Sequence, residues 1–93
     1  MKGIRFSGQI RYWNPERQSG LAVVDVPAEH VDQLGGLKQQ RVRGTIAGTD
    51  FSSNVMPVGG GRLAMSVSKA MMKAAGVAVG DVADFEITGV GRD

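Results

Sequence analysis

Cysteine is absent from this chain of 93 residues, and histidine occurs only once. Without cysteine the chain has no disulfide, no thiolate nucleophile and no thiolate metal site. A single histidine excludes any site that needs two imidazoles from one chain. No apolar run approaches the ~18 residues that a membrane-spanning helix requires. A signal peptide is not expected either, because Arg5, Gln9 and Arg11 interrupt the apolar residues of the N-terminus. We therefore expect a cytoplasmic protein.

A concentrated charge of one sign is also missing. The chain carries 11 Lys and Arg against 9 Asp and Glu, which gives a formal net charge of +2. The basic residues are dispersed along the chain, whereas nucleic-acid-binding proteins gather them on one face. We therefore do not expect nucleic acid or a membrane as the partner. The hydrophobic content of 42% is ordinary for one small globular domain.

Alternating apolar and polar residues predict a mainly β protein with six strands. The clearest strand runs over residues 4–13, and the others are expected at residues 21–27, 41–48, 51–58, 62–67 and 83–88. A turn at Thr49–Asp50 separates the third strand from the fourth. Short helices are expected at residues 28–36, ended by glycine, and at 69–75, capped by Ser68 and ended by Gly76. Closely spaced strands favour a small antiparallel barrel, with one domain over residues 1–90 and a loose tail at 91–93.

The stretch PVGGGRLAMSVSK, residues 57–69, contains the most conspicuous pattern. A phosphate-binding loop would place its glycines before a helix, but Gly59 to Gly61 precede a strand and are predicted to form a hairpin turn. Ser66 and Lys69 match the S-x-x-K spacing of serine acyl-enzymes. The S-x-N element stands in the wrong order, however, and no K-T-G strand follows. Ser68 is better explained as a helix cap.

The other candidate residues have ordinary structural explanations. His30 lies on a polar segment without a nucleophile or an orienting partner. Asp81, Asp84 and Glu86 lack the oxygen-rich loop that calcium needs, so they are interpreted as a solvated strand face. No metal and no cofactor is expected. The methionines are expected in the core or at an interface, at positions Met56, Met65, Met71 and Met72.

Trp13 has two explanations. Strand alternation places it on the same face as Arg5 and Arg11, opposite the apolar series. An amphipathic aromatic residue beside arginines is typical of binding surfaces. The alternative is that the strand twists at its end and Trp13 covers the mouth of the barrel.

Residues 42–87, VRGTIAGTDFSSNVMPVGGGRLAMSVSKAMMKAAGVAVGDVADFEI, resemble the bacterial family DUF1905, a domain of unknown function. The stretches FSGQIRYW and VVDVP match its first strands. The resemblance implies a small six-stranded double-split β-barrel capped by two short helices, similar to the swapped-hairpin barrels of bacterial transition-state regulators. It also implies a stand-alone form, without the YdeI/OmpD-associated segment found in some members. No catalytic residue carries over. Members often have a basic residue near the position of Met72, where Lys73 is the neighbour here.

Three hypotheses follow, in order of preference. The first is a non-enzymatic module that binds an unknown small ligand or a protein partner. Its expected contact residues are Trp13, Arg62, Lys69 and Lys73. The glycine hairpin is expected to bring Arg62 close to the helix that carries the lysines. The second is a DNA-binding dimer related to the swapped-hairpin regulators. The third is a small hydrolase or isomerase. A homodimer is one option for the first hypothesis too, because so small a barrel exposes strand edges and methionines.

Overall fold

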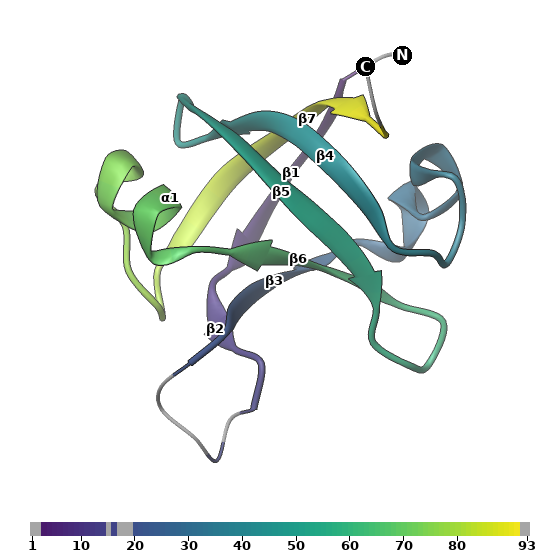
Figure 1. Ribbon diagram of the computed structural model, residues 1–93, viewed down its shortest axis with the longest axis horizontal. Coiled ribbons are helices and arrows are strands. Elements are labelled where there is room, and N and C mark those ends of the chain that lie inside the picture. The colour runs from purple at the N-terminus through teal and green to yellow at the C-terminus, as the bar shows by residue number, and fades with distance from the viewer. Residues whose placement is uncertain (1–2, 15, 17–19, 92–93) are drawn as a thin grey trace.

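The computed structural model describes residues 3–14, 16 and 20–91, and within them the chain is mainly β. Seven antiparallel strands form one sheet that curls into a half-barrel (Figure 1). The order of the strands across the sheet is β1-β7-β4-β5-β6-β3-β2. Along the chain they are β1 (Ile4–Gln9), β2 (Arg11–Tyr12), β3 (Ala22–Val26), β4 (Gln40–Ile46), β5 (Thr49–Pro57), β6 (Leu63–Val67) and β7 (Val82–Val90).

The N-terminal strand is divided, so the described residues contain seven strands where six were predicted. The buried residue Ile10 separates β1 from β2. β1 pairs with β7 at one edge of the sheet, whereas β2 pairs with β3 at the other. The Ile10 N–H donates to the Asp81 carbonyl at 2.9 Å, and the Ile10 carbonyl accepts from the Gly80 N–H at 2.7 Å. The chain therefore crosses from one edge of the curled sheet to the other at Ile10.

Two glycines allow backbone approaches that a larger residue would block. A Cβ atom on Gly8 would lie 2.5 Å from Cγ2 of Val24. A Cβ atom on Gly44 would lie 1.7 Å from the carbonyl oxygen of Glu86. Gly44 also stands where the β4–β7 register shifts. Because such bulges bend a strand and increase its twist, Gly44 supports the curl of the sheet.

One of the two expected helices forms as predicted. Helix α1 (Lys69–Ala75) begins at Ser68, whose hydroxyl accepts a hydrogen bond from the Met71 N–H at 3.1 Å. It ends at Gly76, which has a left-handed φ of 71°. Both the cap and the stop were predicted correctly. No helix in the described part of the chain is long and apolar enough to cross a membrane.

The short helix predicted over residues 28–36 forms only in part, and its stop at glycine is confirmed. This segment forms two short 3-10 turns, η1 (Ala28–His30) and η2 (Asp32–Leu34), and it ends at Gly35 with a φ of 87°. Leu34 is the buried residue of these turns. Because packing of an apolar face supplies most of a short helix's stability, a segment with so little to bury does not sustain an α-helix.

The turn between β4 and β5 also differs from the prediction. It lies at Ala47 and Gly48, with φ values of 48° and 81°, whereas Thr49 and Asp50 belong to β5. The Ile46–Thr49 pair closes the hairpin with a two-residue loop. A two-residue loop of type I′ needs a positive φ at both central residues, as found here. An alanine rarely adopts a positive φ, which is why the sequence did not indicate this position.

The glycine hairpin is confirmed. Gly59, Gly60 and Gly61 have φ values of 86°, 63° and 73° and connect β5 to β6. The Val58 N–H donates to the Arg62 carbonyl at 3.0 Å and closes the loop. The three glycines therefore shape a turn between strands.

The core fills the concave side of the half-barrel. Its side chains come from alternate positions of the strands and from α1, and Met65 and Met71 are among them. Met56 and Met72 are half-buried. The rings of Phe6 and Phe85 stack with centroids 5.4 Å apart, so aromatic packing joins β1 to β7.

β5 and β6 separate beyond their shared hairpin. Their pairing stops at Val55 and Met65, although β5 continues back to Thr49. Helix α1 follows the end of β6 that has diverged from β5 (Figure 1). Where the ladder stops, the buried Ser53 hydroxyl donates to the Ser66 carbonyl at 2.5 Å. A side chain therefore provides a contact between the diverging strands.

The C-terminal strand β7 continues to Val90. The Gly91 N–H then donates to the Arg41 carbonyl at 2.7 Å. Residues 92 and 93 of the expected tail lie outside the described residues.

Candidate functional site

Trp13 and the residues that flank the glycines of the β5–β6 hairpin line one surface pocket, which we call the Trp13 pocket. It has a volume of about 360 Å³ and is lined by Arg11, Trp13, Asn14, Val58 and Arg62. Trp13 follows directly after β2, and its backbone N–H donates to the Leu21 carbonyl at 2.7 Å. The backbone is thereby fixed while the residue remains 42% exposed. The indole therefore lies at the surface beside two arginines.

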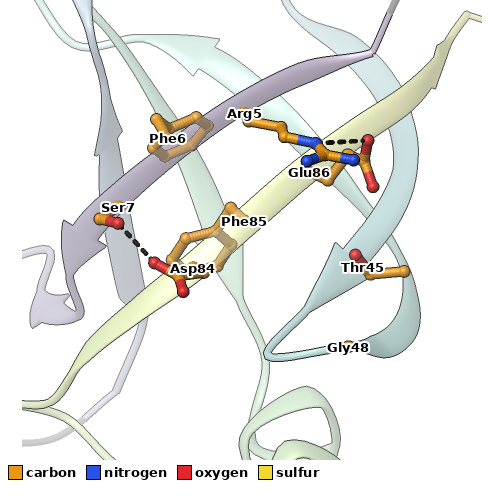
Figure 2. Close-up of a pocket in the computed structure, with 8 residues that line it drawn as sticks. All are labelled: Arg5, Phe6, Ser7, Thr45, Gly48, Asp84, Phe85 and Glu86. Atoms are coloured by element: carbon orange, nitrogen blue, oxygen red, sulfur yellow. Dashed lines mark hydrogen bonds and ion pairs between the residues drawn. The ribbon is translucent and has the colours of Figure 1, made fainter.

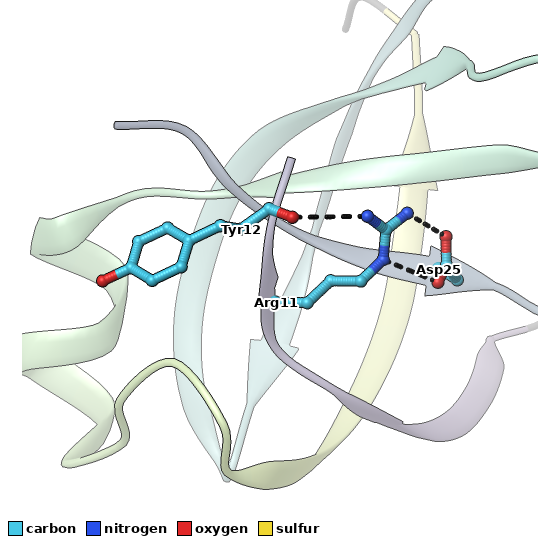
Figure 3. A network of polar contacts seen from close by, with 3 residues as sticks. All are labelled: Arg11, Tyr12 and Asp25. Carbon is cyan, nitrogen blue, oxygen red and sulfur yellow. Dashed lines mark hydrogen bonds and ion pairs between the residues drawn. The ribbon is translucent and has the colours of Figure 1, made fainter. Parts of the chain in front are cut away.

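An ion pair holds Arg11 on this face (Figure 3). The Arg11 Nε donates to Asp25 Oδ2 at 2.9 Å and Nη2 donates to Oδ1 at 2.8 Å. Nη1 donates to the Tyr12 carbonyl at 3.3 Å. Arg11 is opposite Val23 in the β2–β3 register, so Asp25 is its diagonal neighbour. The guanidinium is consequently oriented by three acceptors.

The same contact shifts two pKa values. Hydrogen bonding to Arg11 lowers the pKa of Asp25, partial burial opposes this, and the charges of Arg11 and Arg62 lower it further. Hydrogen bonding to Asp25 raises the pKa of Arg11. Arg62 is thus close enough to act on Asp25 electrostatically. Among the described residues, its side chain has no hydrogen bond or ion pair.

The structure brings two of the four predicted site residues together. Trp13 and Arg62 line the Trp13 pocket. Lys69 lines a different cavity beside α1, and Lys73 lines none of the cavities that we describe. The expectation that the hairpin brings Arg62 close to the helix is wrong. Arg62 precedes β6 and Lys69 follows it, so a strand of five residues lies between them, about 17 Å of chain.

Two of the residues that line the pocket were not predicted. Arg11 was expected on the face of Trp13, but Asn14 and Val58 were not identified. No local signal indicates them, because the pocket joins two segments that are distant in sequence. Arg5, expected on the same face as Trp13, lines another cavity because the chain bends at Ile10.

That other cavity, the β1–β7 cavity, has a volume of about 480 Å³ (Figure 2). Its lining residues are Arg5, Phe6, Ser7, Thr45, Gly48, Asp84, Phe85 and Glu86. Four of the polar side chains are paired with one another: Arg5 Nε lies 3.0 Å from Glu86 Oε2, and the Ser7 hydroxyl donates to Asp84 Oδ1 at 2.5 Å. A ligand would have to compete with these contacts, so we favour the Trp13 pocket as the site.

The rejected chemical motifs have structural roles. Ser68 caps α1 and Ser53 bonds to the Ser66 carbonyl. His30 Nδ1 lies 2.7 Å from Gln33 Oε1. In the described residues, no three His, Asp or Glu side chains gather into a group that could hold a metal ion.

Comparison with known proteins gives a family for the chain. The model of the family described as a domain of unknown function (DUF1905) matches residues 6–87. A comparison with curated proteins gave no match.

Proposed function

Because the chain belongs to the DUF1905 family of domains of unknown function, we propose a function from the chemistry of the Trp13 pocket. The protein is a non-enzymatic module that binds a small ligand there. The ligand carries an anionic group beside a flat ring. The observation that carries this proposal is the exposed indole of Trp13 in the same pocket as the Arg62 guanidinium.

The Trp13 indole and the Arg62 guanidinium each match one chemical group of the proposed ligand. An indole face favours a flat ring, and aromatic pairs contribute about 0.5–1.5 kcal/mol beyond burial. The Arg62 side chain has no hydrogen bond or ion pair among the described residues, so its N–H donors are open to an anion. A guanidinium fork matches carboxylate and phosphate oxygens. Arg11 adds positive charge, which Asp25 partly offsets.

The two rival functions have less support. Two of the arginines are paired with carboxylates, Arg5 with Glu86 and Arg11 with Asp25, which weakens the basic face that DNA binding requires. An enzyme of the serine class would need a serine hydroxyl poised beside a base. Ser53 and Ser68 instead make contacts within the fold. Ser7 does donate to the Asp84 carboxylate in the β1–β7 cavity, but it lies outside the S-x-x-K pattern that suggested this class. A gel-shift assay at low salt tests the DNA alternative directly.

The chain contains one tryptophan, so intrinsic fluorescence reports directly on the Trp13 pocket. We would titrate phenyl phosphate, which combines a ring with an anion, and inorganic phosphate, which lacks the ring. Phenyl phosphate is expected to change the Trp13 emission at lower concentration than phosphate. Arg62→Gln should weaken its binding about tenfold, because a hydrogen bond to a charged group contributes about 1.5–3 kcal/mol.

Arg5→Gln is the matched control, because it removes the same charge from the β1–β7 cavity and leaves the Trp13 pocket intact. Its affinity should stay within twofold of the parent. If both substitutions weaken phenyl phosphate binding equally, the effect is explained by net charge alone and the proposal is contradicted. So would an emission that stays constant at millimolar phenyl phosphate.

We also propose that the half-barrel is of the double-split type. The support is that β5 and β6 pair only near their hairpin, and that β2 pairs with β3 over two residues. Amide hydrogen exchange tests this. Alternate amides of residues 49–54, those that face away from β4, should exchange fast. Uniform protection along β5 would indicate a closed barrel and refute the split.

A further inference from the structure

A second cavity, which we call the α1 cavity, lies between the start of β3 and helix α1. Its volume is about 230 Å³. The buried residues Ala22 and Val67 line it, together with the more exposed side chains of Leu21, Met72 and Val79. Its surroundings are therefore largely apolar, unlike those of the β1–β7 cavity.

The α1 cavity is distinct from the Trp13 pocket although β2 contributes to both. Tyr12 lines the α1 cavity, whereas its neighbours Arg11 and Trp13 line the Trp13 pocket. Successive side chains of a strand point to opposite faces, and Figure 3 shows the Tyr12 ring directed away from the Arg11 guanidinium. A ligand in one site therefore does not occupy the other.

Lys69 gives the α1 cavity a positive charge. It is the first residue of α1, and it lines the cavity next to Ser68. Its ammonium group makes no hydrogen bond or ion pair with any described residue. The Ser68 hydroxyl already accepts a bond from the Met71 N–H, but its own hydrogen remains able to donate. The cavity thus combines apolar lining with cationic and hydroxyl donors.

We propose that the α1 cavity binds a short amphipathic monocarboxylate, with its carboxylate on Lys69 and its chain against Leu21, Met72 and Val79. The volume sets the size of the ligand. At ~30 Å³ per water molecule, 230 Å³ corresponds to about eight waters, whereas pockets for drug-sized ligands have volumes of roughly 300–1,000 Å³. A saturated acid of about six carbons matches this volume. This site is independent of the function proposed for the Trp13 pocket.

The experiment is an NMR titration of the ¹⁵N-labelled protein with hexanoate and with 1-hexanol, its neutral counterpart. Hexanoate should shift the amides of Tyr12, Met72 and Val79 and should bind about fivefold more tightly than 1-hexanol, as expected for a partly exposed ion pair. Lys69→Gln should abolish this preference. Met72→Gln should weaken both ligands, because it places a polar amide in the apolar lining.

Lys73→Gln is the matched control, since it removes the same charge from the same helix outside the cavity. It should retain the preference for hexanoate. The proposal is overturned if Lys69→Gln also retains that preference, or if Lys73→Gln loses it equally. It is overturned as well if hexanoate shifts no amide of the cavity in the parent protein.

Discussion

Replacing Asp25 with asparagine tests the electrostatics of the Trp13 pocket. The substitution keeps the shape of the side chain but removes the charge that pairs with Arg11 at 2.8 Å. The two side chains are 37% and 44% exposed, so solvent screens the pair and its contribution is about 0.5–1 kcal/mol. We expect Asp25→Asn to lower the free energy of unfolding at pH 7 by that amount. For a domain of this size the melting temperature should fall by about 2–8 °C.

The free energy of unfolding lost in Asp25→Asn should decrease as the pH falls. Because hydrogen bonding to Arg11 lowers the pKa of Asp25 in the folded protein, the contact stabilises fully above the unfolded-state value of about 3.9. The contribution disappears as the pH falls through the folded-state pKa. The raised pKa of Arg11 has the opposite sign, and its contribution is lost only in strong alkali. Parent and variant should therefore differ at pH 7 and converge in acid.

Urea unfolding from pH 7 to pH 2.5, monitored by far-UV circular dichroism, measures the difference in free energy of unfolding between parent and variant. Asp50→Asn is the control, because Asp50 is exposed on β5 and its carboxylate has no hydrogen-bond or ion-pair partner among the described residues. Its difference from the parent should be small at every pH. A difference for Asp25→Asn that stays constant from neutral to acid pH would refute the linkage to Arg11.

Two further predictions concern the strands that position the sites. Ser53→Ala removes the contact to the Ser66 carbonyl and should cost about 1–3 kcal/mol, because a buried acceptor loses its donor. Ser52→Ala removes only an exposed hydrogen bond from Arg41 and should cost less than about 0.5 kcal/mol. Equal losses of unfolding free energy in urea would contradict the role of Ser53. Gly44→Ala places a Cβ 1.7 Å from the Glu86 carbonyl oxygen. It should lower the free energy of unfolding by about 3 kcal/mol or more, beyond ordinary overpacking. A melting temperature close to that of the parent would contradict this prediction and show that β4 can shift there.

Much of the fold could be predicted from local pattern. The alternation in β1 and β7 marks residues such as Ile4 and Phe85 as inward-facing, and both are buried. Ser68 and Gly76 marked the ends of α1 because capping chemistry is local. No local pattern indicates the division at Ile10. The apolar alternation continues through Ile10, although the strand before it pairs with β7 and the strand after it pairs with β3.

The candidate site was only partly predictable, because part of it depends on how distant segments are arranged and not on local pattern. An exposed aromatic beside a basic residue drew attention to Trp13, and strand alternation correctly associated it with Arg11. That Arg62 lines the pocket of Trp13 depends on how β2 and the β5–β6 hairpin are arranged in space. The sequence instead suggested a location beside α1, because α1 begins only seven residues after Arg62. Proximity in sequence was a poor guide where a whole strand, β6, intervenes.

The most direct test of the account is to locate bound phenyl phosphate by NMR on the ¹⁵N-labelled protein. We expect the largest shifts at the Trp13 indole N–H, the Arg62 Nε–H and the backbone amides of Asn14 and Val58. The amide of Lys73 should stay unchanged. Shifts centred on Arg5 and Glu86, or no shifts at all, would contradict the assignment of the Trp13 pocket as the binding site.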